Sequence, residues 1–180
     1  MDFMKKLMKT VDLWIPDERQ LSMDKGHEFE NYVANLFKLK SDYFAIEEWT
    51  TDHSDKRAGI RVESDSSPDF LIRYKPINDV FAVECKWRAN PYYNQRIDDY
   101  VIKWAESYQI KNYQKYSKQM NIPVFIVIGL AGKPSHPDYI FCVPLEVAKY
   151  PELFPSVLDK FERDPPNKPF FWDTKNKKLS

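Results

Sequence analysis

The chain has 180 residues, which is enough for one domain with a substantial hydrophobic core. Hydrophobic residues make up 43% and charged residues 30%, a balance typical of globular proteins and not of disordered ones. The 27 basic and 27 acidic residues cancel, so the chain lacks the overall positive charge of many nucleic-acid-binding proteins. Any contact with nucleic acid must therefore come from a local patch.

Cysteine usage and hydropathy bear on the compartment. Cys85 and Cys142 lie in apolar, strand-like runs, so we expect buried free thiols, as in a cytosolic protein. Their spacing matches no metal-binding cysteine pattern. Because no apolar run reaches the length of a signal-peptide core or a membrane span, the sequence predicts a cytoplasmic protein without a membrane partner.

Two helices are predicted before the first strand. Residues 1 to 14 place apolar side chains on one helical face and lysines opposite, which predicts an amphipathic helix that packs on its own domain or on a second subunit. A second helix is predicted from about Asp24 to Lys40, and Glu30 lies at the edge of its apolar face, where a solvated glutamate is the simplest interpretation. The apolar positions of this helix are Phe29, Tyr32, Val33, Leu36, Phe37 and Leu39.

Strands are predicted at residues 44–49, 70–74 and 80–87, with a polar loop over 50–67. Basic side chains in this loop could neutralise phosphate charge, although a solvated surface loop explains each of them as well. The candidates in the loop are His53, Lys56, Arg57 and Arg61.

The third of these strands carries the strongest functional signal. Its alternation sends Phe81, Val83 and Cys85 to one face, while the other face receives Ala82, Glu84 and Lys86. A hairpin-like return from the preceding strand would bring Asp69 beside Glu84.

Two carboxylates about 4 Å apart repel by roughly 4 kcal/mol at an effective dielectric constant near 20. A hard divalent cation would remove this repulsion, and oxygen ligands suit magnesium or manganese. The alternative is structural, with Glu84 and Lys86 forming an edge-strand ion pair and Asp69 capping a turn.

The next segments offer a candidate substrate surface. Arginines and tyrosines interleave after the third strand, where tyrosine can stack on unpaired bases and arginine can bind phosphate; the alternative is a loop that packs on the sheet edge. The candidates are Arg88, Tyr92, Tyr93 and Arg96. A long helix is predicted over 98–120, with Gln109, Tyr113 and Tyr116 on a flanking face. Its predicted core stripe is Ile97, Val101, Trp104, Ala105 and Tyr108.

The remainder is predicted as strands at 124–128 and 139–143, followed by a proline-rich extension. In that extension Phe170-Phe171-Trp172 forms an apolar anchor, for which an edge strand and a partner contact are both open. We divide the chain into an amino-terminal extension (1–22), a core domain (23–150) and a carboxy-terminal extension (151–180).

Three motifs carry a resemblance to a known family. Pro68-Asp69 followed by Glu84-Cys85-Lys86 resembles the PD-(D/E)xK signature of the restriction-endonuclease-like nuclease superfamily. The run Gly26-His27-Glu28-Phe29-Glu30 resembles the Gly-x-x-Phe-Glu pattern of archaeal Holliday-junction resolvases and type IV restriction nucleases. Gln109 and Tyr113 resemble the Gln-x-x-x-Tyr motif of RecB-like nucleases.

The resemblance implies an α/β fold with a mixed central sheet flanked by helices, an αβββαβ core, and extra elements at both ends. It further implies a metal-dependent DNA nuclease. Mg²⁺ or Mn²⁺ would be held by Asp69, Glu84, the backbone carbonyl of Cys85 and Glu30, with Lys86 as a further catalytic residue. Gln109 and Tyr113 would contact the substrate or orient the lysine.

Several alternatives stay open at this level. An endonuclease is the main interpretation, and a non-catalytic DNA-binding or assembly module with the same fold is the rival. The sequence leaves RNA open as a substrate. A homodimer is compatible with it, because cutting both strands of a duplex suits two subunits.

Overall fold

The computed structural model describes residues 22–50 and 67–180 of the chain. The predicted helix over 1–14 and the loop residues His53, Lys56, Arg57 and Arg61 lie outside these ranges. Among the described residues, no helix combines the length and hydropathy needed to cross a membrane. Cys85 and Cys142 are buried free thiols, as predicted.

A mixed five-stranded sheet forms the centre of the molecule, in the order β1-β2-β3-β6-β7. Strand β2 runs antiparallel to both β1 and β3, β6 runs parallel to β3, and β7 runs antiparallel to β6. The strands are β1 (Phe44–Trp49), β2 (Phe70–Tyr74), β3 (Asp79–Arg88), β6 (Val124–Leu130) and β7 (Tyr139–Pro144).

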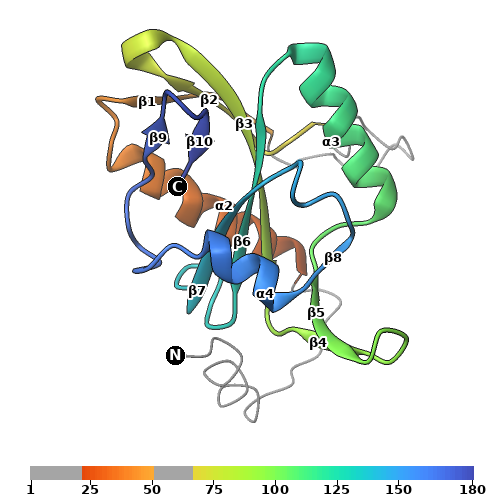
Figure 1. Cartoon of the computed structure of the whole chain (residues 1–180). Coiled ribbons are helices and arrows are strands. Elements are labelled where there is room, and N and C mark those ends of the chain that lie inside the picture. The colour runs from red at the N-terminus through yellow and green to blue at the C-terminus, as the bar shows by residue number, and fades with distance from the viewer. Residues whose placement is uncertain (1–21, 51–66) are drawn as a thin grey trace, which may run out of the picture.

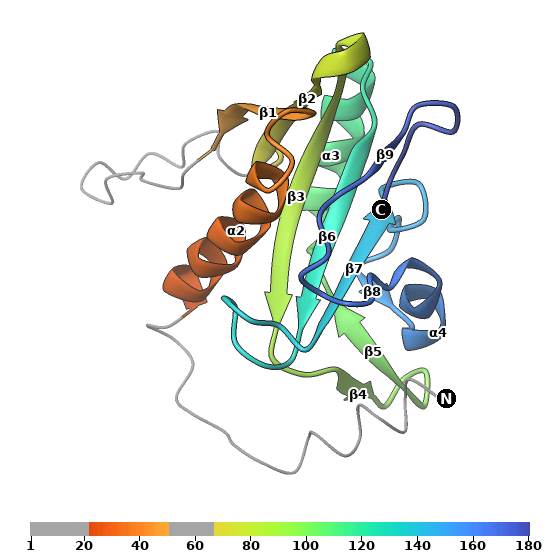
Figure 2. The same ribbon diagram turned by 90° about the vertical axis from the view of Figure 1, so that its left-hand side faces the viewer.

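Helices cover both faces of this sheet (Figures 1 and 2). Helix α2 (Ser22–Lys38) lies on one face, and α3 (Ser107–Met120) lies on the other. The element order therefore contains the predicted αβββαβ core, with two further strands inserted between β3 and α3. The predicted fold class, an α/β mixed sheet flanked by helices, is confirmed.

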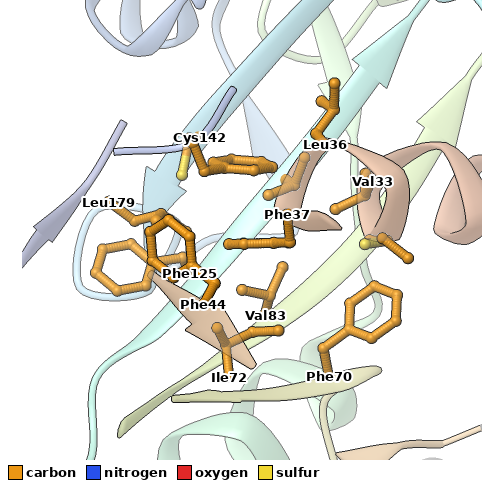
Figure 3. Packing of buried hydrophobic residues seen from close by; sticks show 14 of the residues in the cluster. Val33, Leu36, Phe37, Phe44, Phe70, Ile72, Val83, Phe125, Cys142 and Leu179 are labelled. Carbon is orange, nitrogen blue, oxygen red and sulfur yellow. The ribbon is translucent and has the colours of Figure 1, made fainter. Parts of the chain in front are cut away.

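The core on the α2 side is strongly aromatic (Figure 3). The ring of Phe81 stacks on Trp172 at a centroid distance of 4.5 Å and meets Phe125 edge-on at 5.8 Å. Helix α2 approaches β6 closely at Gly129, because a Cβ there would lie 2.4 Å from the ring of Phe29. Glycine at this position thus allows the helix to lie against the sheet.

The predicted helix over 98–120 is wrong in its first part. Asp99–Lys103 forms strand β5, which pairs with β4 (Tyr92–Asn94) and β8 (Glu152–Leu153) in a small separate sheet. In the predicted core stripe, Val101, Trp104 and Ala105 are buried, whereas Ile97 and Tyr108 are exposed. The helix starts only at Ser107, because Glu106 and Gln109 form a capping box there.

The segment after residue 150 belongs to the same hydrophobic core. Strand β8 and the short helix α4 (Pro155–Leu158) pack on the α3 side of the sheet, while the hairpin of β9 (Trp172–Asp173) and β10 (Lys178–Leu179) covers the α2 side. Phe170 and Trp172 are buried, whereas Phe171 is exposed. The apolar anchor therefore packs, through Phe170 and Trp172, into the chain's own core.

Candidate functional site

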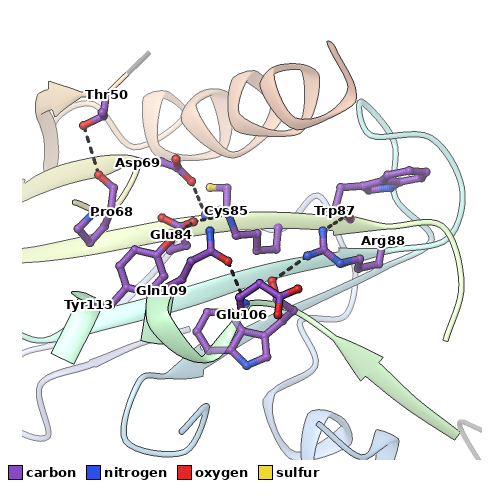
Figure 4. Close-up of polar contacts among 12 residues, drawn as sticks. Thr50, Pro68, Asp69, Glu84, Cys85, Trp87, Arg88, Glu106, Gln109 and Tyr113 are labelled. Atoms are coloured by element: carbon purple, nitrogen blue, oxygen red, sulfur yellow. Dashed lines mark hydrogen bonds and ion pairs between the residues drawn. The ribbon is translucent and has the colours of Figure 1, made fainter. Parts of the chain in front are cut away.

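Antiparallel pairing of β2 with β3 brings two acids together. Phe70 pairs with Val83, so the preceding residue, Asp69, lies at the level of Glu84. An Asp69 carboxylate oxygen accepts a hydrogen bond from the backbone N–H of Cys85 at 2.6 Å. Figure 4 shows the Asp69 side chain directed toward the Cys85 backbone, with the Glu84 side chain nearby. Two elements that are adjacent through a tight turn thus deliver both carboxylates to one place.

Glu84 is the most unusual residue of the site, because its side chain is only 2% exposed. Its Oε1 accepts a hydrogen bond from the hydroxyl of Tyr113 at 2.6 Å and lies 2.5 Å from Nζ of Lys86. Within the described part of the chain, its Oε2 is buried and has no hydrogen-bond partner. A buried carboxylate oxygen without a partner is costly, so this atom calls for a ligand.

Burial and the crowding of acids raise the pKa of Asp69 and of Glu30. Burial raises the pKa of Asp69 well above its usual range, and the negative charges of Glu84 and Glu30 add to this effect. Burial likewise raises the pKa of Glu30, with a smaller contribution from Glu84. Burial acts to lower the pKa of Lys86, but the charges of Glu84 and Asp69 outweigh it and raise that pKa instead. The site therefore holds a fixed positive charge among crowded acids.

Glu30 reaches the site from α2 and is held there by two aromatic residues. The indole N–H of Trp49, at the end of β1, donates a hydrogen bond to Glu30 Oε2 at 3.3 Å. His27 Nδ1 lies 3.5 Å from the same oxygen, and the His27 and Trp49 rings lie 6.0 Å apart. These two residues were not predicted as part of the site. Of the two, only His27 could have been predicted from the sequence, because it lies three positions before Glu30 and thus on the same helical face.

These residues fit a hard divalent cation. In the described ranges, no three side chains of His, Cys, Asp or Glu form a ready-made ligand cluster. Magnesium does not require one, because it is usually bound through one or two carboxylates and keeps several waters. The partnerless oxygen of Glu84 and the raised pKa of Asp69 both indicate a place where a cation would lower the energy. Asp69 and Glu84 are the two carboxylates that fit.

A cleft of about 460 Å³ opens over this site. It mixes the acids Glu30 and Asp69 with basic side chains, and Lys25 Nζ lies 5.6 Å from the ring centre of Trp87 at its rim. The cleft is lined by Lys25, Gly26, Glu30, Asp69, Cys85, Lys86, Trp87, Arg88, Ala89 and Gln109. An anionic substrate that also bears a metal-bridging group would suit this combination of charges.

The two residues of the predicted Gln-x-x-x-Tyr motif lie differently. Gln109 lines the cleft, and its side-chain oxygen accepts the backbone N–H of Glu106 at 2.9 Å. Tyr113 is only 2% exposed and directs its hydroxyl to Glu84. Tyr113 therefore positions the carboxylate of Glu84. Of the two motif residues, only Gln109 faces the cleft that a substrate would occupy.

The predicted substrate residues at the end of β3 and beyond it do not gather at one place. Arg88 lines the cleft, but its guanidinium donates to the backbone carbonyls of Lys103 at 2.6 Å and of Trp87 and Trp104, both at 2.8 Å. Arg96 lines a different, apolar groove of about 670 Å³ between β5 and α4. The structure therefore does not bring Arg96 to the carboxylates, and it uses Arg88 to tie β3 to β5.

The two tyrosines of β4, Tyr92 and Tyr93, contact different acids. The hydroxyl of Tyr92 bonds to Glu152, and that of Tyr93 bonds to Asp98. Because side chains alternate along a strand, these neighbours point in opposite directions. Neither lines the cleft over the carboxylates, although Tyr92 lines an adjoining pocket.

Comparisons with known proteins found a structural similarity but no similarity in sequence. No family model matches the chain, and no curated protein matches it in sequence. A solved structure of Hjc, a Holliday junction resolvase from the archaeon Archaeoglobus fulgidus, is similar with a TM-score of 0.47 and 16% identity. The match covers 75% of this chain and 93% of that chain. A similarity of this size does not assign a function, which has to be argued from the site itself.

Proposed function

We propose that this chain is a metal-dependent deoxyribonuclease that hydrolyses phosphodiester bonds as an endonuclease. The observation that carries the proposal is Glu84: a buried carboxylate with one oxygen bound by Lys86 and Tyr113 and the other without a partner. The PD-(D/E)xK-like motif and the αβββαβ order support placement in the nuclease superfamily named above.

The proposed ligands are Asp69, Glu84 and the backbone carbonyl of Cys85, with Glu30 acting directly or through a water. When bound, Mg²⁺ or Mn²⁺ would neutralise charge on the phosphate and lower the pKa of a coordinated water. Tyr113 holds Oε1 of Glu84 in place, which would leave Oε2 available to a bound ion. Trp49 holds Glu30 at the other edge of the site.

Lys86 is the proposed electrostatic catalyst. Its side chain is 21% exposed and lines the cleft, while Glu84 fixes the position of its ammonium group. Because its pKa is raised, the group stays charged at neutral pH. A fixed point charge at the phosphate stabilises the negative charge that builds up during attack, or orients the attacking water.

The rival function, a DNA-binding module without activity, fits the site less well. Pure binding gains nothing from acids that face DNA phosphates, and the chain has no net positive charge to offset them. We propose DNA as the partner, a homodimer for cutting both strands, and the cytoplasm as the location, where buried free thiols stay reduced.

The test uses supercoiled plasmid, linear duplex and single-stranded DNA, each with and without manganese. An endonuclease nicks or linearises the closed plasmid, whereas an exonuclease leaves it intact. We expect Asp69→Ala and Glu84→Ala to abolish cleavage while circular dichroism shows a retained fold. The matched control is Glu47→Ala, which removes a surface carboxylate paired with Arg73 and should leave cleavage unchanged. Metal-dependent cleavage that persists in both site variants would overturn the proposal.

A further inference from the structure

A second pocket adjoins the cleft over the carboxylates. It has a volume of about 280 Å³ and shares Arg88 and Gln109 with the cleft as lining residues. Arg88, Gln109 and Glu106 lie together beside the β3 strand in Figure 4. A substrate whose phosphate lies over Asp69 and Glu84 would therefore have its next chemical group at the mouth of this pocket.

The lining of the pocket is suited to a planar, hydrogen-bonding ring. Tyr92 contributes an aromatic side chain that is 40% exposed, and the largely buried Ala105 also lines the pocket. The amide of Asn90 carries donors and an acceptor, and the amide nitrogen of Gln109 adds donors, which matches the mixed pattern on the edge of a nucleobase. The volume lies just below the roughly 300 Å³ at which pockets for drug-sized ligands begin, so it suits a single heterocycle.

The ring of Tyr92 is fixed from behind. Its hydroxyl bonds to Glu152, which also accepts a hydrogen bond from the Asn94 side chain at 2.7 Å. Glu152 belongs to β8, the neighbour of β5 in the small sheet. A ring held in this way can stack on a base without losing much conformational entropy on binding.

We propose that this pocket takes an unpaired nucleobase next to the phosphate that is cleaved, and that Tyr92 stacks on it. The proposal rests on the proposed nuclease function and narrows its substrate class. A base inside a duplex is stacked and paired, and bringing it out costs a few kcal/mol. DNA with unpaired nucleotides, such as a single strand, a loop or a flap, is therefore the preferred substrate over continuous duplex.

The adjacent tyrosine provides a matched control. Tyr93 has similar exposure, 46%, and also uses its hydroxyl on an acid, but it points to the other side of β4 and does not line the pocket. Tyr92→Ala and Tyr93→Ala thus remove the same side chain from neighbouring positions. Tyr92→Phe keeps the ring and loses only the contact with Glu152, so it should bind the loop more tightly than Tyr92→Ala does.

The experiment compares a DNA hairpin with a thymidine loop against the same hairpin with an abasic loop. Binding is measured by fluorescence anisotropy and cleavage with manganese, and thermal melting checks the fold of each variant. Base–aromatic stacking predicts that Tyr92→Ala weakens binding to the thymidine loop by about 5- to 150-fold. With the abasic loop, the wild type should already show this loss, and Tyr92→Ala should add little to it.

Equal losses with both loops, or an equal effect of Tyr93→Ala, would overturn the base pocket. The result also separates the two proposals. Manganese-dependent cleavage without any dependence on the loop bases leaves the nuclease standing and removes the pocket. Binding that depends on Tyr92 and on the bases, without any cleavage, leaves the pocket standing and removes the nuclease.

Discussion

The two faces of strand β3 have opposite compositions. Toward α2, Phe81, Val83 and Cys85 are buried in an aromatic core. Toward α3, Ala82 packs in the other core, and the next positions on that face are Glu84 and Lys86. Neighbouring side chains of β3 thus differ in what they contribute. One face stabilises the sheet, and the other carries charges that burial disfavours.

The charged face shows how a candidate site differs from a structural ion pair. A pair made only for stability would satisfy both oxygens of its carboxylate, yet Glu84 Oε2 has no partner in the described ranges. The neighbouring acids add repulsion, as the raised pKa values of Asp69 and Glu30 show. A local cost of this kind, inside an otherwise well-packed sheet, is typical of functional sites.

The largest effect on the apolar face is expected from Phe81→Ala. This side chain contacts four other aromatic rings and is fully buried, so its removal should lower the free energy of unfolding by about 3–5 kcal/mol. Denaturant titration measures the loss, and Ile77→Ala, at a side chain that is 52% exposed, should change it by less than about 0.5 kcal/mol. Equal effects at both positions would contradict the assignment of this face as the stabilising one.

On the charged face, Lys86→Met should reduce cleavage rather than fold content. Removing a preorganised charge from the reacting phosphate typically slows turnover by roughly 10²- to 10³-fold. Single-turnover kinetics at saturating manganese measure the rate. The control is Lys111→Met, which removes an exposed lysine from α3 and should leave the rate unchanged. A similar rate in both variants would mean that Lys86 is only a counterion for Glu84.

A smaller effect is expected from Trp49→Phe, which removes the indole N–H that holds Glu30. Loss of such a supporting contact typically weakens metal affinity by about 10- to 100-fold, and we expect the lower end because the bond is long. Calorimetric titration with manganese measures it. Trp172→Phe removes the hydrogen bond to Asp79, on a different part of the sheet, and should change stability without changing manganese affinity.

The smallest expected difference between the two faces is in the pH dependence of stability. A raised pKa means that folded Asp69 holds its proton at pH values where the unfolded chain has lost it. Its contribution is therefore fully present below about pH 4 and is lost as the pH rises through the raised value, at up to about 1.4 kcal/mol per pH unit. Metal-free Asp69→Asn should show a flatter dependence in denaturant titrations. Parallel curves of stability against pH for both proteins would show that the pKa of Asp69 is not raised in the folded state.

Much of this architecture was readable from local patterns. The alternation of β3 and the apolar face of α2 follow from periods of 2 and 3.6, and both were predicted with the correct faces except at Leu39, which lies beyond the end of α2 and is 64% exposed. The error over 98–103 arose because Val101, Trp104 and Ala105 fit a helical stripe. The pairing that overrides it comes from Glu152 and Leu153, far along the chain.

The site was predictable where it lies on one hairpin and less so where it depends on distant contacts. Asp69 and Glu84 share a hairpin, so the spacing between them already indicated their meeting. The hydrogen bond of Trp49 to Glu30 joins a strand to a helix, so no local sequence pattern predicts it. The same holds for Tyr92 and Tyr93, whose different positions depend on which side of β4 faces the adjoining pocket.

Manganese titration by calorimetry tests the central claim most directly, since it asks whether the acids bind a cation at all. The comparison is between the wild type, Glu84→Gln and the surface control Glu47→Gln. Glutamine preserves the size of the side chain and removes the charge. We predict saturable binding in the wild type and in Glu47→Gln, and its loss in Glu84→Gln. Unchanged binding in Glu84→Gln, or no binding in the wild type, would contradict the account.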